Sequence, residues 1–163
     1  MTLLRFLMLL GLIVWLGALI FFPVVAQTSF SVLPSRHLAG TVVGRSLGIL
    51  HWMGITSGLI FLASSVIYAR LSTGNFHIFA ARNVLICLML ALTLISQFSV
   101  IPRMDGLRTS IGGEIDSVPI DNPARMQFDS LHAWSERIEQ AVLLMGLVVV
   151  YLTASAFHMK PLS

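Results

Sequence analysis

The stretch that decides the fold is GTVVGRSLGILHWMGITSG, residues 40–58, which holds five glycines and one histidine in an apolar setting. In water each glycine inside a helix costs about 1 kcal/mol relative to alanine. In lipid the balance differs, because leaving the helix would strand backbone hydrogen-bonding groups without water. An apolar segment rich in glycine is therefore typical of a membrane-spanning helix.

The glycines of this stretch share one arc of the expected helix, at about 100° per residue. The set is Gly40, Gly44, Gly48, Gly54 and Gly58. Small residues at such spacing let two membrane helices approach closely. The pattern predicts a packing face, and leucine at Gly48 or Gly54 is expected to force the helices apart.

The composition supports a membrane protein. The 163 residues are 56% hydrophobic and 10% charged, and the mean hydropathy is +0.90. Soluble domains carry roughly 25% charged residues. The net charge of +3 comes from scattered arginines, which form no basic stripe, so no nucleic-acid partner is expected. The single cysteine, Cys87, allows no intrachain disulfide and leaves the redox compartment open.

Four apolar runs are long enough to span a bilayer, which takes about 20 residues. We expect spans at about residues 3–26, 43–69, 78–101 and 126–158, with a polar loop over 102–122. The fold class is therefore all-α: a single integral membrane domain over residues 1–163, an up-down four-helix bundle. Asn122 and Pro123 are suited to the N-cap and first position of the last helix. That helix is too long for the bilayer alone and should extend beyond it.

Charge is distributed unevenly along the chain. All seven acidic residues fall on the side of the first and third loops: Asp105, Glu114, Asp116, Asp121, Asp129, Glu136 and Glu139. The other side carries Arg5, Arg70, Arg82 and Lys160. The positive-inside rule counts only basic residues, and the first helix often dominates it. Arg5 therefore favours cytoplasmic termini, and we expect an integral protein of the bacterial cytoplasmic membrane.

His51 lies in the middle of the glycine arc, about 20° from Gly40 in projection, and should point into the packed interior. One interpretation is a hydrogen bond to a neighbouring helix. The other is a functional group that ligates haem, a metal or a pigment, or that relays protons, because polar residues at membrane depth mark functional sites.

A polar stripe precedes the last apolar run, with spacing that pairs Arg125 with Asp129 and His132 with Glu136. It is either the wetted face of an amphipathic helix or an inward face. In the second case Glu136 would hold His132, and Arg45 or Arg103 would balance Asp129. The predicted polar cluster comprises Arg45, His51, Arg103, Arg108, Asp129, His132, Ser135 and Glu136.

Motifs for catalysis do not occur in the sequence: it contains no glycine-rich phosphate loop, Cys-x-x-Cys pair or His-Glu-x-x-His motif. We therefore expect no enzyme, no catalytic residues and no metal site. No cofactor is expected either, with haem or a pigment bound through His51 or His132 as the alternative.

Three strings together resemble the transmembrane protein 205-like family, whose domain has no known function. They cover residues 15–52, residues 96–108 (SQFSVIPRMDGLR) and residues 125–147, which contain a Phe-x-x-Leu-His-x-x-Ser pattern. That pattern places Phe128, Leu131, His132 and Ser135. Many members have an asparagine after the serine, which this sequence lacks. The resemblance implies a four-helix membrane fold and, from its eukaryotic members, handling or export of small solutes or soft metals.

Three functions fit these observations. The first is an accessory or structural subunit that packs through the glycine face against other membrane subunits or a second copy of itself. The second is a small-solute or soft-metal transport or tolerance protein. The third is a haem- or pigment-binding module. The lipid bilayer is a partner in each case.

Overall fold

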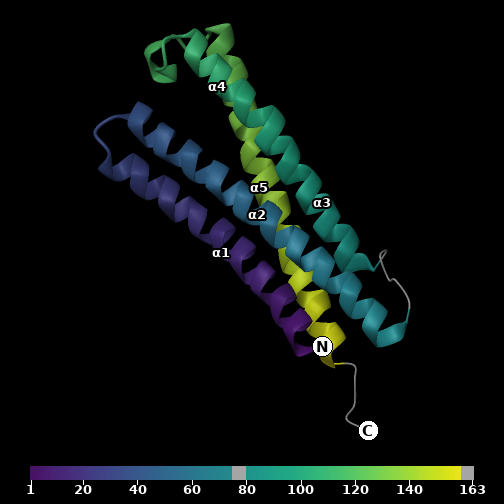
Figure 1. Ribbon diagram of the computed structural model, residues 1–163. Helices are drawn as coiled ribbons and strands as arrows, with labels where there is room; N and C mark the ends of the chain where they lie inside the picture. The colour runs from purple at the N-terminus through teal and green to yellow at the C-terminus, as the bar shows by residue number, and fades with distance from the viewer. Residues whose placement is uncertain (75–79, 159–163) are drawn as a thin grey trace.

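The computed structural model describes residues 1–74 and 80–158, and it is helical almost throughout (Figure 1). The long elements are α1 (Thr2–Val32), α2 (Arg36–Thr73), α3 (Ala81–Ile95) and α5 (Pro123–His158). A π-helical turn, η1 (Ser96–Val100), joins α3 to α4 (Ile101–Ser110), and a short 3₁₀ turn, η2 (Ile115–Ser117), precedes α5.

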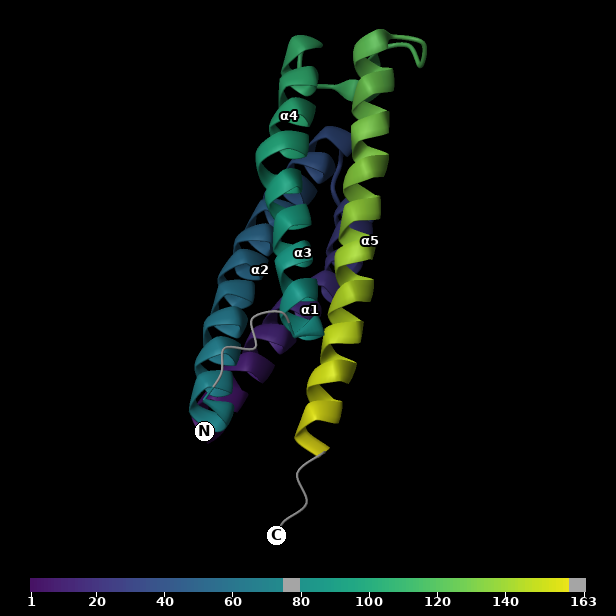
Figure 2. The ribbon, with the colours of Figure 1, turned by 90° about the vertical axis from the view of Figure 1, so that its right-hand side faces the viewer.

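Four of these helical stretches are long and apolar enough to cross a membrane: α1, α2, the continuous α3–η1–α4 and α5 up to Ser155. They run up and down in chain order, with α1 packed along α2, and α3 packed between α2 and α5 (Figures 1 and 2). The predicted fold class, an all-α membrane bundle, is confirmed.

Several helices are longer than the apolar runs from which the sequence predicted them. α1 continues past residue 26 to Val32 with Pro23 inside it, and α2 begins at Arg36 instead of residue 43. Ser35 caps α2, because its side chain accepts a hydrogen bond from the Leu38 N–H at 3.2 Å. Hydropathy marks the part of a helix in lipid, whereas caps mark its ends. The expected start of the third span, residue 78, lies outside the described residues.

The expected loop over 102–122 is helical up to Ser110, and the π turn explains why. A proline inside a regular helix lacks an N–H and clashes with the carbonyl one turn earlier. Before Pro102 the helix widens, and the Ile101 N–H bonds the carbonyl of Ser96, five residues back. The wider turn accommodates Pro102, so one helix continues from Ala81 to Ser110.

The start of α5 follows the sequence prediction. Asn122 Oδ1 accepts hydrogen bonds from the N–H groups of Ala124, at 2.9 Å, and Arg125, at 3.4 Å. Pro123 is the first helical residue. The cap therefore fixes where the projecting part of α5 begins.

Replacing Asn122 by alanine should destabilise this end of α5. The variant loses the side-chain acceptor for two N–H groups, at a cost of about 0.5–2 kcal/mol. Amide hydrogen exchange followed by mass spectrometry should show faster exchange over the first turns of α5, with α1 unchanged. Equal exchange in the wild type and the variant would show that the cap contributes nothing.

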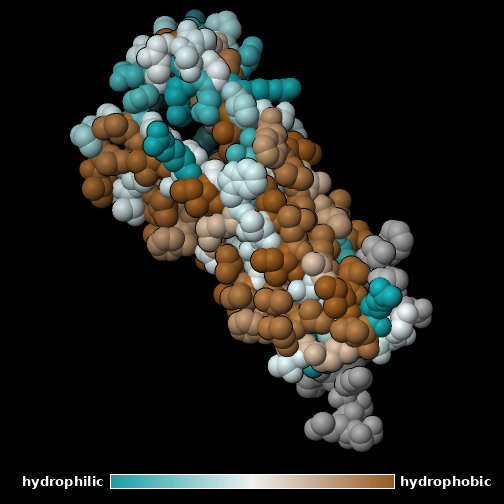
Figure 3. Space-filling model, in the orientation of Figure 1, coloured by the Kyte–Doolittle hydropathy of each residue, from teal (hydrophilic) through white to brown (hydrophobic). Residues whose placement is uncertain are grey.

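The core lies where all four long helices meet. It is built from large apolar side chains of every helix, among them Trp15, Phe61, Ile86, Met89 and Val142. Apolar side chains also cover the outer surface, and Figure 3 shows them over the middle of the bundle and toward the termini, while hydrophilic residues gather at the α4–α5 end. This surface suits a bilayer around the bundle.

The glycine arc does not form one continuous packing face. A Cβ at Gly58 would lie 2.9 Å from Trp15 and 2.8 Å from Leu90, and one at Gly54 would overlap the Trp15 indole. Around Gly44 and Gly48, however, no neighbouring heavy atom of the described residues lies within 4 Å of that position. Gly44 and Gly48 therefore do not pack closely against another described helix of this chain, because the α1–α2 hairpin diverges from α4 and α5 toward that end (Figure 1). A Cβ at Gly40 would lie 3.4 Å from the Arg108 guanidinium.

Candidate functional site: a buried histidine between three helices

His51 of α2 is fully buried, and both of its ring nitrogens are engaged. Nδ1 lies 2.8 Å from Oε1 of Gln97 in the π turn η1. Nε2 lies 2.7 Å from Oε1 of Glu139 on α5. The His51 side chain is 0% exposed and that of Glu139 is 14% exposed. Three separate helical elements therefore converge on one imidazole inside the membrane domain.

The hydrogen bonds restrict where the protons of this network sit. The Gln97 oxygen is an acceptor only, so the His51 Nδ1–H donates to it. The remaining proton lies between Nε2 and the Glu139 carboxyl. It gives either an imidazolium–carboxylate pair or a neutral imidazole with a carboxylic acid, and both have zero net charge. A buried site favours such neutrality, because an uncompensated charge there is costly.

One oxygen of Glu139 is left over. Oε2 is buried and has no hydrogen-bond partner within residues 1–74 and 80–158. Ser96, adjacent to Gln97, is also buried, and its hydroxyl lacks a partner in the same part of the chain. A buried carboxyl oxygen without a partner is available to accept a hydrogen bond from a small polar molecule.

The local backbone places these side chains. Gln97 lies in the π turn, and such single turns occur frequently at functional sites. Glu139 follows buried Ser135 by one turn on α5 and precedes buried Val142, so the inner face of α5 carries it toward α2. Ser135 belongs to the predicted cluster and lies on this inner face.

His132 is not part of this site. It pairs with Glu136 at 3.3 Å, as predicted, but their side chains are 56% and 62% exposed. The His132 ring stacks on Phe128, over which the Arg108 guanidinium lies. The prediction of one site holding both histidines is therefore wrong. His132 precedes Glu139 by seven residues, about 10 Å along the helix axis, and Glu139 instead of Glu136 turns inward.

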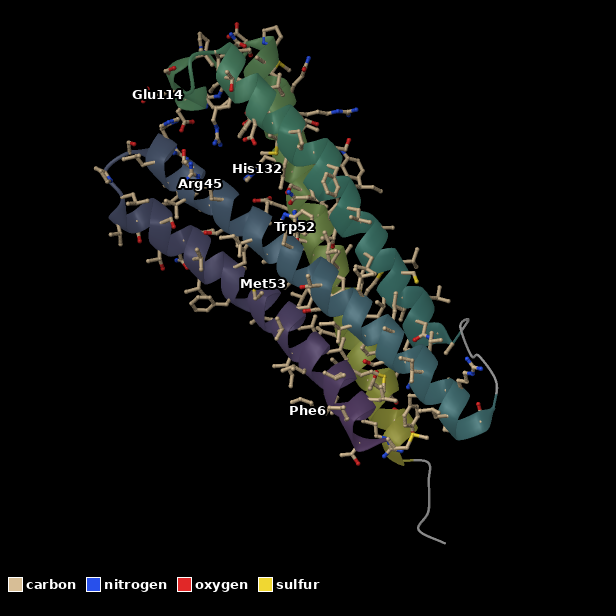
Figure 4. The ribbon with its side chains drawn as sticks, in the orientation of Figure 1. Phe6, Arg45, Trp52, Met53, Glu114 and His132 are labelled. Carbon is tan, nitrogen blue, oxygen red and sulfur yellow. The ribbon has the colours of Figure 1, made fainter. Side chains whose placement is uncertain are left out.

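Three charged residues of the predicted cluster also lie away from His51. Arg45, Arg103 and Asp129 are exposed, and Figure 4 shows Arg45 and His132 at the end where α2 leaves α4. Arg103 lines an open groove of about 540 Å³ between α4 and α5. Asp129, His132 and Glu136 on α5 are all exposed, as the first of the two interpretations expects.

Two contacts tie the diverging helices together at their tip. His37 Nδ1 lies 2.8 Å from the carbonyl oxygen of Gly113, and Arg36 lies 3.2 Å from Asp116. The part of α2 between these two contacts and His51 includes Gly44 and Gly48, which border open space. Figure 3 shows a hollow in the surface between the tip of the α1–α2 hairpin and the α4–α5 end. The network therefore lies below an open side of the bundle.

Sequence reasoning missed Gln97 and underrated Glu139. Gln97 is an amide inside the third apolar run, and Glu139 is the acidic residue nearest to the last one, which are signals that could have found them. In the described residues, no group of three His, Cys, Asp or Glu side chains could hold a metal ion.

A family comparison agrees with a membrane protein of unassigned function. Residues 10–111 match the model of a domain of unknown function, DUF4149. That range includes His51 and Gln97, whereas Glu139 lies beyond it. The chain matches no curated protein and no solved structure. Because the match covers more than half of its length, the chain belongs to the DUF4149 family.

Proposed function

We propose that this chain provides a membrane site that binds protons or a small polar solute through the side chains of His51 and Glu139. In this proposal the chain performs no catalysis. The buried His51–Glu139 contact carries the proposal. Ionisable residues inside membrane domains are rare and mark ion pathways, proton relays and solute sites. This is the small-solute alternative of the sequence analysis, narrowed to protons and polar solutes.

A purely structural role explains the pair poorly. Replacing a buried ion pair by well-packed apolar side chains is often neutral or even stabilising. The free Oε2 of Glu139 adds a further cost that packing alone would remove. A network that keeps a proton and an unused acceptor is suited to exchange, since an incoming donor can use the acceptor and an incoming base can take the proton.

The same geometry disfavours a haem or pigment at His51. Ligation needs a free ring nitrogen, and both nitrogens of His51 already contact Gln97 and Glu139. A cofactor would have to displace one of these partners. His132 is exposed and stacked on Phe128, which offers no enclosed pocket.

Flux measurements in liposomes test the proposal. Purified protein is reconstituted with a pH-sensitive dye inside, and decay of an imposed pH gradient is followed alone and with small cations such as methylammonium or guanidinium. We expect decay faster than in empty liposomes, and Glu139→Gln should return the rate to the empty value.

The matched control is Glu136→Gln on the same helix, because Glu136 is exposed and pairs with His132. It should keep the wild-type flux. Equal fluxes for the Glu139 and Glu136 variants, or a wild type no faster than empty liposomes under every condition, would contradict the proposal.

A second function has its own supporting observation. Gly44 and Gly48 border open space, and such small residues admit a helix of a partner subunit. As an accessory subunit, the chain would co-purify in a larger assembly. Gly44→Leu and Gly48→Leu should then release the partner in gentle detergent without lowering the stability of the isolated chain. A wild-type chain that elutes alone under these conditions would leave this function without support.

A further inference from the structure

The net charge of the His51–Glu139 pair limits what can bind beside it. The His51 Nδ1–H is engaged by Gln97 at 2.8 Å, so one proton remains, between Nε2 and Oε1 of Glu139, which lie 2.7 Å apart. With this proton the pair is neutral. A cation bound beside it would leave an uncompensated positive charge in the interior, which is costly, whereas loss of the proton would restore neutrality. The pair can therefore hold the proton or one monovalent cation, but not both.

The charged residues nearest to the pair along α2, α4 and α5 are exposed. They include Arg45 of α2, Arg103 of α4 and Arg137 of α5. Glu136 of α5 is exposed as well and pairs with exposed His132 at 3.3 Å. Exposed charges are screened by water and ions, so these groups balance little of a charge at the buried pair.

The helices α1 and α3 contribute one charged residue each, both toward the other end of the bundle. Arg5 lies in the first turn of α1 and contacts Tyr68 near the end of α2, and Arg82 lies in the first turn of α3. Among the side chains that the structure describes, His51 is the only ionisable one that is buried. A charge that enters the site must therefore be balanced by the pair itself.

Once the proton has left, the pair presents only acceptors to a solute. The Glu139 carboxylate offers Oε1 and Oε2, and Oε2 already lacks a partner in the described part of the chain. Neutral His51 offers the lone pair of Nε2. Hard divalent cations take about six or more oxygen ligands, whereas a nitrogen cation needs only acceptors for its N–H groups. We propose, resting on the function proposed above, that this site exchanges one proton for one small monovalent cation that carries N–H donors.

The exchange is electroneutral. The cation meets Glu139 first, because 14% of that side chain is exposed and His51 is fully enclosed. One N–H group of the cation donates to Oε2, and the proton shared by Nε2 and Oε1 passes to water. His51 keeps its Nδ1–H on Gln97 throughout. Reversal on the other side of the membrane returns a proton and releases the cation, so no net charge crosses.

Liposomes that contain the full chain and an internal pH dye test the exchange. The pH and the K⁺ concentration are equal on both sides, valinomycin holds the membrane potential at zero, and guanidinium, which stays charged at neutral pH, is added outside. The interior should become alkaline, because each guanidinium that enters expels a proton. Tetramethylammonium has the same charge but no N–H group, and it should leave the internal pH unchanged.

Two variants assign the exchange to the buried carboxylate. Glu139→Gln should reduce alkalinisation to the rate of empty liposomes, because the amide has no negative charge with which to balance a cation. Glu136→Gln removes an exposed carboxylate from the same helix and should keep the wild-type rate. Equal rates for the two variants would contradict the assignment.

A measurement on the wild type alone does not depend on whether a variant folds. Protein in detergent, without buffer and with a pH indicator, is titrated with guanidinium at millimolar concentration. One proton should be released per chain at saturation, and tetramethylammonium should release none. Absence of proton release would overturn the exchange, and equal release by both cations would overturn recognition through N–H donors.

The failure of the exchange can be told apart from the failure of the proposed function. A wild type that speeds the decay of a pH gradient but shows no guanidinium-driven alkalinisation at zero potential still conducts, and only the exchange is overturned. A wild type that behaves like empty liposomes in both experiments contradicts the proposed function and the exchange together.

Discussion

Replacing His51 by alanine should lower the free energy of unfolding by about 3–5 kcal/mol, the typical cost of removing one partner of a buried ion pair. The variant leaves Oε1 of Glu139 without its His51 partner, and it leaves the Gln97 oxygen without its donor. It also opens a cavity at a side chain that is fully buried. All three effects act in the same direction.

The measurement is unfolding in mixed micelles of mild detergent and SDS, followed by circular dichroism. His132→Ala is the matched control, because it removes the same side chain from an exposed position. Exposed substitutions usually change stability by no more than about 0.5 kcal/mol. Similar losses in the two variants would mean that His51 is not enclosed as described.

Replacing Gly54 by leucine should give the second-largest effect, a loss of about 1–3 kcal/mol from overpacking. Even the first added carbon would overlap the Trp15 indole, 2.7 Å from its Cε2 atom. Trp15 lies on α1, is buried against the neighbouring helices and belongs to the main core. Its indole therefore cannot make room for the leucine without separating α1 from α2.

Gly48→Leu is the control for this prediction, since it adds the same side chain to the same helix. A Cβ added at Gly48 would meet no heavy atom of the described neighbours within 4 Å, so the isolated chain should retain its thermal stability in detergent. The sequence alone predicted a loss at both positions. A wild-type melting temperature for Gly54→Leu, or an equal drop for Gly48→Leu, would contradict the packing of α2 on α1.

The sequence was sufficient for the fold but not for the helix ends. Apolar runs of spanning length leave few alternatives, because only helices satisfy the backbone of such segments in lipid within one run. The same runs do not report where a helix stops in water. α2 begins seven residues before its apolar run, at the Ser35 cap, and α4 continues through Pro102 because of a π turn that no hydropathy pattern reveals.

The site was predictable in part. The glycine arc correctly placed His51 on the inward face of α2, since this face is set by the helical period. Its partners were not predicted, because they depend on the rotation and depth of other helices. A difference of three residues along α5 separates exposed Glu136 from Glu139 in the interior. The path of α2 away from α4 likewise left Gly44 and Gly48 uncovered.

A double-mutant cycle tests most directly whether His51 and Glu139 form one unit inside the bundle. Unfolding free energies are measured for His51→Ala, Glu139→Ala and the double variant, and for the parallel cycle of His51→Ala with His132→Ala. The double His51–Glu139 variant should be more stable than the sum of the single losses implies, with a coupling of about 0.5–3 kcal/mol, because removing both partners leaves no unpaired group. The His51–His132 cycle should be additive within about 0.5 kcal/mol. Additivity of His51 with Glu139, or coupling of His51 to His132 instead, would contradict the site described here.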